Sequence, residues 1–121
     1  MLWRHQAQGR DGQMHVVIFR ARARALDEAY LETAAQLRQL ALDSFNCIAF
    51  EAVTEGDREI ALSYWHDEDD IRRWKRQADH LAAQRLGAAR WYVHYSVEVA
   101  RIERSYRSDE RVAVGPGQGE P

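Results

Sequence analysis

The sequence predicts a single α+β domain whose elements follow one another in the order β-α-β-β-α-β. Segments 15–24, 46–54, 59–66 and 91–106 are rich in β-branched and aromatic residues, and most of them alternate apolar with polar positions, as half-buried strands do. Two segments between them instead repeat their apolar residues every three or four positions, as amphipathic helices do. Together these two periods indicate an antiparallel sheet with two helices.

The first half of the chain supplies one helix and the start of a hairpin. The strand at 15–24 ends in arginines at every second position, and the helix at 27–42 follows it. The apolar stripe of this helix consists of Leu26, Tyr30, Leu37, Leu40 and Ala41. The strand at 46–54 then meets turn residues around Gly56, so we expect a hairpin with the strand at 59–66.

The second half repeats the strand-helix-strand pattern. Asp67 precedes an acidic first turn and is placed to cap the second helix, which Gly87 is placed to end. The buried stripe of this helix consists of Ile71, Trp74, Ala78, Leu81 and Ala82. The last strand spans 91–106. We expect residues 1–14 to be a loose N-terminal arm, 15–107 to be the folded domain and 108–121 to be a disordered tail.

This element order is that of the ferredoxin-like fold, in which right-handed crossovers place both helices on one face of the sheet. Apolar residues occupy both faces of the predicted strands, for example Val16 and Ile18 against Val17 and Phe19. Two helices cover only one of these faces. A second copy of the sheet is the simplest cover for the other, so the pattern predicts a homodimer.

Composition narrows the possible functions. The 121 residues carry a formal net charge of -2, which favours neither nucleic acid nor an anionic membrane as a partner. The sequence shows no leader-like segment and no long apolar run, so we expect a cytoplasmic protein that does not associate with membranes. The single cysteine, Cys47, lies in an apolar run, where a buried packing role is favoured over a reactive thiol. The sequence carries no Gly-rich phosphate loop, which argues against a nucleotide cofactor.

Several motifs resemble the antibiotic biosynthesis monooxygenase family, in its small stand-alone bacterial members. They are VIFRARAR in the first strand, SYW in the third, IRRWK and HLAAQRLG in the second helix, WYVHY in the last strand and ARIERSY at its end. The resemblance spans residues 16–106. It implies a dimeric α+β barrel and, in some members, oxygenation without metal, haem or flavin. In those members an aromatic substrate between helices and sheet is deprotonated and then reacts with dioxygen.

Three residues are candidates for a catalytic role. The resemblance places Trp74 on the wall of the active site, although its place in the apolar stripe is also explained by packing. Asp70 lies where monooxygenase relatives carry an asparagine, and it would be a base only if desolvation raised its pKa. Its alternative role is to stabilise the helix dipole. His80 is an acid-base candidate by residue type, but it projects away from the stripe, toward solvent or a neighbouring subunit.

Three further aromatic residues, Trp65, Trp91 and Tyr92, are candidates for substrate binding, with core packing or dimer contact as the alternative. No histidine has carboxylate or other ligands at metal-site spacing, so we expect no metal. Haem-degrading relatives need a histidine where this chain has Gln84 and an asparagine where it has Phe19 or Arg20. Haem degradation is therefore the least favoured of the possible functions.

Two functions therefore remain open from the sequence. The first is a cofactor-independent monooxygenase that uses dioxygen to oxidise a small aromatic compound. The second is a non-catalytic dimeric module that binds a small ligand or is associated with stress. An enclosed, partly polar cavity beside Trp74 would favour the first function, and a collapsed core at that place would favour the second.

Overall fold

The computed structural model describes residues 3–5, 13–24, 27–84 and 91–108, and the predicted helix end at Gly87 and the predicted tail beyond 108 lie outside them. The helices and strands within these ranges are β1 Trp3–His5, β2 His15–Ala23, α1 Glu28–Ser44, β3 Ala49–Glu55, β4 Arg58–Trp65, α2 Glu68–Gln84, β5 Tyr92–Arg101 and β6 Tyr106–Ser108.

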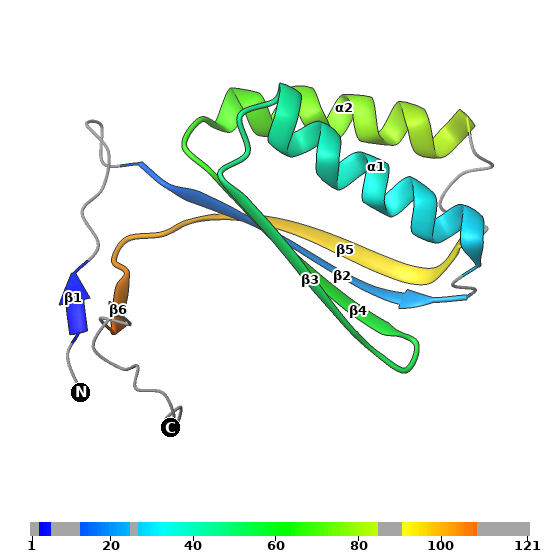
Figure 1. Ribbon diagram of the computed structural model, residues 1–121, viewed down its shortest axis with the longest axis horizontal. Coiled ribbons are helices and arrows are strands. Elements are labelled where there is room, and N and C mark those ends of the chain that lie inside the picture. The colour runs from blue at the N-terminus through cyan, green and yellow to red at the C-terminus, as the bar shows by residue number, and fades with distance from the viewer. Residues whose placement is uncertain (1–2, 6–12, 25–26, 85–90, 109–121) are drawn as a thin grey trace, which may run out of the picture.

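The main sheet has four strands in the order β3-β4-β2-β5, and every neighbouring pair is antiparallel. Both helices pack on one face of this sheet, and none of the described helices and strands covers the opposite face (Figure 1). This arrangement confirms the predicted β-α-β-β-α-β order and the ferredoxin-like fold.

The core lies between the helices and one side of the strands. Val17 of β2 stands opposite Ser63 of β4 and Val99 of β5, so these side chains share the helix-facing side of the sheet. The buried cluster beneath the helices consists of Val17, Ala41, Cys47, Trp65 and Ile71. Burial of this apolar surface is the main force that holds the helices on the sheet.

Helix ends follow from specific residues. Asp27 caps α1, because its carboxylate accepts the backbone N–H of Tyr30 at 2.9 Å. Asp67 caps α2 in the predicted way, accepting the backbone N–H of Asp69 at 2.8 Å. After α1 ends, Asn46 takes a left-handed conformation with φ 66°. The next strand therefore begins at residue 49, three residues later than predicted.

The last predicted strand is divided in the structure. β5 ends at Arg101, which pairs with His15, the first residue of β2. Beyond that point β2 offers no partner, and the chain re-forms a strand only at β6. β6 pairs with β1, with Trp3 opposite Ser108, so the predicted loose arm contains a short strand. No periodicity in the sequence indicates this second sheet, since three-residue strands are too short to show one.

The open face of the main sheet is apolar at its centre. The side chains of Val16, Ile18, Leu62 and Tyr64 share it, because their strand registers place them opposite one another. Val53 and Ile60 are 68% and 42% exposed there. Charged residues lie toward its edges, where Arg20 pairs with Glu98 at 2.6 Å and Arg22 pairs with Asp57 at 3.1 Å.

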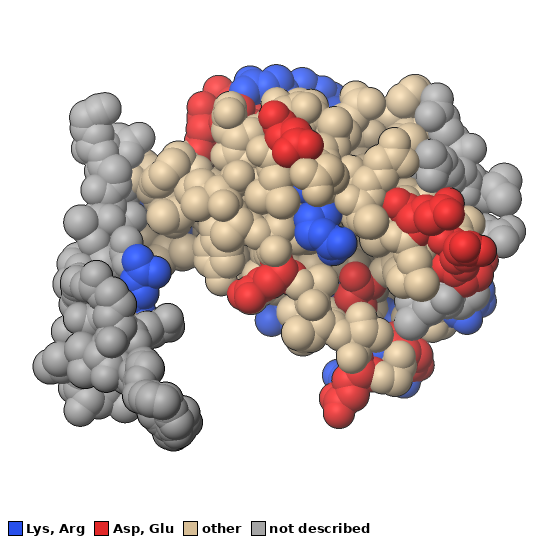
Figure 2. Space-filling model, viewed as in Figure 1, with Lys and Arg blue, Asp and Glu red and all other residues tan. Residues whose placement is uncertain are grey.

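Acidic and basic side chains are interspersed on the face seen in Figure 2. Neither of the two helices, over the residues described, is long and apolar enough to cross a membrane.

Candidate functional site

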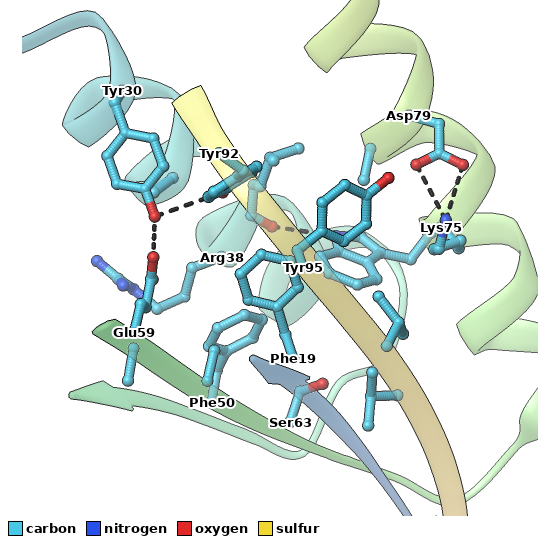
Figure 3. A pocket seen from close by; sticks show the side chains of 18 residues that line it. Phe19, Tyr30, Arg38, Phe50, Glu59, Ser63, Lys75, Asp79, Tyr92 and Tyr95 are labelled. Atoms are coloured by element: carbon cyan, nitrogen blue, oxygen red, sulfur yellow. Dashed lines mark hydrogen bonds and ion pairs between the residues drawn. The ribbon is translucent and has the colours of Figure 1, made fainter. Parts of the chain in front are cut away.

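A cavity of about 170 Å³ lies between the two helices and the sheet, is lined by side chains from both layers and is partly open to the surface (Figure 3). The residues that line it come from both helices and from all four strands of the main sheet. Its apolar and aromatic wall consists of Val17, Phe19, Tyr30, Ala34, Leu37, Phe50, Ala52, Ala61, Trp74, Ala78, Tyr92, Tyr95 and Val97. Its polar lining consists of Arg38, Glu59, Ser63, Lys75 and Asp79.

Two groups of aromatic rings form part of the wall. In the first, the ring centroid of Phe19 lies 5.5 Å from that of Tyr92 and 5.8 Å from that of Tyr95. In the second, the centroid of Phe50 lies 6.1 Å from that of Trp74. Edge-to-face and tilted pairs of this kind hold rings in fixed orientations. The cavity is therefore shaped by rigid rings, which suits a flat ligand.

The predicted binding residues divide into wall and core. Trp74 and Tyr92 both line the cavity, and the indole N–H of Trp74 donates to the carbonyl oxygen of Leu37 at 3.1 Å. Trp65 and Trp91 are 0% and 3% exposed and do not line the cavity. Trp65 lies against Trp74 with ring centroids 5.6 Å apart, so it supports the wall from behind.

The two predicted acid-base residues lie away from the cavity. Asp70 is 6% exposed, accepts the side-chain amide of Asn46 at 3.3 Å and forms an ion pair with Arg73. These contacts join α2 to the loop that follows α1. His80 is exposed on α2, and neither residue lines the cavity. Trp74 and Tyr92 thus line the same cavity, whereas Asp70 and His80 do not line it.

Glu59 is a carboxylate of the cavity lining that the sequence reasoning missed. Glu59 near the start of β4 accepts a hydrogen bond from the hydroxyl of Tyr30 on α1 (Figure 3). The hydroxyl of Tyr92 on β5 donates in turn to the hydroxyl oxygen of Tyr30 at 3.4 Å. Glu59 is in phase with Ala61 and Ser63 on the helix-facing side of β4. A carboxylate on the buried side of an alternating strand was the signal that could have identified it.

The surroundings of Glu59 and Tyr92 raise the pKa of both side chains. Burial raises the pKa of the Glu59 carboxyl above its usual value, because an apolar environment disfavours the charged form. The pKa of the Tyr92 phenol is also raised, first by burial and then by the negative charges of Glu59 and Tyr95. Tyr92 therefore stays protonated near neutral pH and acts as a hydrogen-bond donor.

The other charged groups of the cavity lining differ from Glu59 in their ion pairing and their exposure to solvent. Asp79 is paired with Lys75 one turn away on α2, with Nζ of Lys75 2.9 Å from Oδ2 of Asp79; the Asp79 side chain is exposed and that of Lys75 is half-buried. Arg38 of α1 lines the same cavity, and over the part of the chain described here it forms no ion pair with Glu59. Glu59 is thus the carboxylate of the lining that lacks a cationic partner within the described ranges.

The described residues offer no clustered metal ligands, and their cysteine is buried. No group of three or more histidine, cysteine, aspartate or glutamate residues that could hold a metal ion occurs among the described residues. Cys47 is buried, its thiol donates to the carbonyl oxygen of Ala49 at 3.2 Å, and burial raises its pKa. A thiol with a raised pKa is a poor nucleophile, because the thiolate is the reactive form.

The fold and the cavity define a ferredoxin-like α+β protein with an aromatic pocket under its helices. The chain belongs to the same protein family as the uncharacterized protein YqjZ of Bacillus subtilis, to which it is 37% identical over 91 residues. That match covers 74% of this chain and 80% of YqjZ. No protein-family model matches the chain.

A second relative is jasmonate monooxygenase ABM of Pyricularia oryzae, which is 33% identical over 101 residues. The match covers 80% of this chain but 47% of that enzyme, so the chain spans about half of its length. Among solved structures, protein SO0527 from Shewanella oneidensis has a TM-score of 0.63 at 13% identity, covering 84% of this chain and 97% of that one. SnoaB, a cofactor-independent oxygenase from Streptomyces nogalater, has a TM-score of 0.57 at 13% identity, covering 71% and 89%. At these identities the structural similarity shows the shared fold alone.

Proposed function

We propose that this protein belongs to the antibiotic biosynthesis monooxygenase family and oxidises a small aromatic compound with dioxygen, without a metal, haem or flavin. The observation that carries the proposal is the aromatic cavity beside Trp74, which lies between the helices and the sheet and is partly open to the surface. Two named relatives agree with it, since one is a monooxygenase and another is a cofactor-independent oxygenase.

The size of the cavity suggests a small substrate. Apolar cavities of roughly 150 Å³ bind benzene, and this cavity measures about 170 Å³. A single substituted ring therefore fits better than a fused polycyclic compound. The aromatic rings of the wall would orient a flat substrate and shield its ring from water.

The proposed chemistry balances without an added reductant when the ring is already electron-rich. A dihydroxybenzene that has lost a proton donates electrons to dioxygen. One oxygen atom enters the ring as a hydroxyl in place of hydrogen, and the other leaves as water. The ring supplies all four electrons and becomes a hydroxyquinone. The cavity contributes by orienting the ring, removing a proton and keeping water out.

We further propose that the protein works as a homodimer, in which two copies cover the open faces of their sheets. The support for this is the apolar centre of that face, formed by residues such as Ile18 and Leu62, with the partly exposed Ile60 beside them. Ion pairs toward its edges would frame the contact. Exposed apolar patches of this kind on soluble proteins commonly mark an interface.

The test of oxygenation is dioxygen consumption with hydroquinone, catechol and resorcinol, corrected for autoxidation with heat-denatured protein. We expect consumption equal to substrate loss, with one labelled atom in the product when ¹⁸O₂ is supplied. Ala34→Leu fills the cavity from α1 and should reduce the rate about tenfold or more, since a displaced ring loses its orientation. Ala35→Leu places the same side chain on the exposed side of α1 and should leave the rate unchanged.

Failure to consume dioxygen with any of these compounds would count against the enzyme. If the compounds still bound, and Ala34→Leu still prevented binding, the non-catalytic ligand-binding module would be the better description.

A further inference from the structure

The hydrogen bonds at the polar end of the cavity run in one direction, toward Glu59. The hydroxyl of Tyr92 donates to that of Tyr30, and the hydroxyl of Tyr30 donates to Oε1 of Glu59. Both donors therefore point toward the carboxylate. Such an array stabilises negative charge on Glu59 and leaves it as the final acceptor of the chain.

One oxygen of that carboxylate remains available. Tyr30 bonds Oε1, and within the residues that the structure describes no donor bonds Oε2. Glu59 lines the cavity together with apolar side chains such as Phe19 and Ala61. A ligand in the cavity thus lies beside a carboxylate oxygen to which no donor of the described residues is bonded.

We propose that Glu59 recognises a ring hydroxyl of the ligand through Oε2 and accepts its proton, with Tyr30 and Tyr92 as positioning residues. This inference rests on the proposed function only in taking the cavity as the ligand site. In the transfer, the O–H bond of the ligand breaks and its electron pair stays on oxygen as a phenolate. The proton forms a new O–H bond on Glu59, which becomes a neutral carboxylic acid.

The surrounding charges favour this step. The raised pKa of Glu59 brings it closer to that of a phenol, which lowers the free energy needed for the transfer. The groups that face the cavity around Glu59 are Tyr30 and Arg38 from α1, Tyr92 and Tyr95 from β5, and the Lys75–Asp79 pair from α2. The positive charge of Arg38 stabilises a phenolate formed in the same cavity.

The ligand class follows from this assignment. A neutral single ring with at least one hydroxyl group satisfies both the aromatic wall and Oε2 of Glu59. A plain hydrocarbon ring would leave that oxygen without a donor. A carboxylated ring would bring a second negative charge next to Glu59 unless Arg38 bound it first.

The test compares two probes of nearly equal shape, 4-chlorophenol and 4-chlorotoluene, which differ in a hydroxyl against a methyl group. Binding is followed at neutral pH by tryptophan fluorescence, with Trp74 on the wall as reporter. We expect the wild type to prefer 4-chlorophenol by about ten- to a hundredfold, the range of a hydrogen bond to a charged group. Glu59→Gln should abolish most of that preference while still binding 4-chlorotoluene, which shows that the variant is folded.

A matched substitution and a pH series complete the test. Glu32→Gln changes an exposed carboxylate on α1 outside the cavity and should preserve the preference. In the wild type, affinity for 4-chlorophenol should fall as pH is lowered and Glu59 becomes protonated, whereas in Glu59→Gln it should not change. Tyr30→Phe should shift this pH dependence to higher pH, because Glu59 loses its donor.

An unchanged preference for 4-chlorophenol in Glu59→Gln would overturn the proposal. So would tighter binding of 4-chlorobenzoate that depends on Arg38 and not on Glu59. Neither outcome bears on dioxygen consumption. If Glu59→Gln loses the preference and the wild type consumes no dioxygen, the inference about Glu59 stands and the proposed oxygenase activity is refuted.

Discussion

The indole N–H of Trp74 donates to the backbone carbonyl oxygen of Leu37 across 3.1 Å, and this bond joins α2 to α1 above the cavity. The same indole lies 5.6 Å from Trp65 and 6.1 Å from Phe50, measured between ring centroids. Trp74 therefore both holds the two helices together and forms the wall that a ligand would contact.

Trp74→Phe should lower stability and ligand affinity together. The smaller ring loses the hydrogen bond to Leu37 and part of its packing, so the free energy of unfolding should fall by about 1–3 kcal/mol. Urea unfolding measures the first effect, and 4-chlorophenol binding measures the second. Trp91→Phe removes the same ring volume from a buried site that does not line the cavity, so it should leave affinity unchanged. Equal losses of affinity in the two variants would contradict this role for Trp74.

Glu59→Gln should change the pH dependence of stability. The folded-state pKa of Glu59 is raised by burial, so the folded protein holds this proton at higher pH than the unfolded chain does. Stability therefore falls as pH rises from the unfolded pKa through the folded pKa. The variant lacks this group, so its free energy of unfolding relative to the wild type should increase between acidic and neutral pH. Urea unfolding over a pH series, with Glu32→Gln as control, measures the difference, and a constant difference would contradict the raised pKa.

Ile18→Glu should abolish the proposed dimer. Ile18 lies on the open face of the sheet opposite Leu62, and a charge there would be buried by a second copy. Light scattering during size-exclusion chromatography at micromolar concentration should report two subunits for the wild type and one for the variant. Leu31→Glu places the same charge at an apolar residue that is 56% exposed on α1, and should leave the dimer intact. A single-subunit wild type would refute the homodimer.

Asp70→Ala should destabilise the fold and leave the ligand site unaffected. The substitution removes two contacts of a buried carboxylate, to Arg73 and to the side-chain amide of Asn46, and should lower the free energy of unfolding by about 1–3 kcal/mol. Asp69→Ala removes the neighbouring exposed carboxylate and its pair with Arg72, and should lower stability by less than about 1 kcal/mol. Urea unfolding compares the two. A loss of 4-chlorophenol binding in Asp70→Ala would instead return Asp70 to the site.

The fold could be predicted because its pattern is regular. Alternation in the strands and the stripe around Trp74 in the second helix depend only on which positions face the core, and that information is local. The division of the last strand could not be predicted in this way. It depends on where β2 begins at His15, which is a property of the pairing and not of residues 102–106 themselves.

The site was predictable only in part. Trp74 and Tyr92 carry large aromatic rings whose positions follow from their elements, and both line the cavity. Glu59 was missed because a charged residue three positions after a turn glycine is usually solvated. Its contact with Tyr30, 29 residues earlier, exists only once α1 has packed on the sheet.

The pairing of Trp3 with Ser108 brings the two ends of the described chain side by side (Figure 1). Joining them with a linker and reopening the polypeptide at Gly56, where the β3–β4 hairpin turns with open space around it, would yield a circular permutant. That rearrangement would keep every strand next to its present neighbours while freeing the start of β4. It would thus loosen the end of β3 together with the start of β4, where Glu59 lies, and make that carboxylate more mobile without repacking the helices above the sheet.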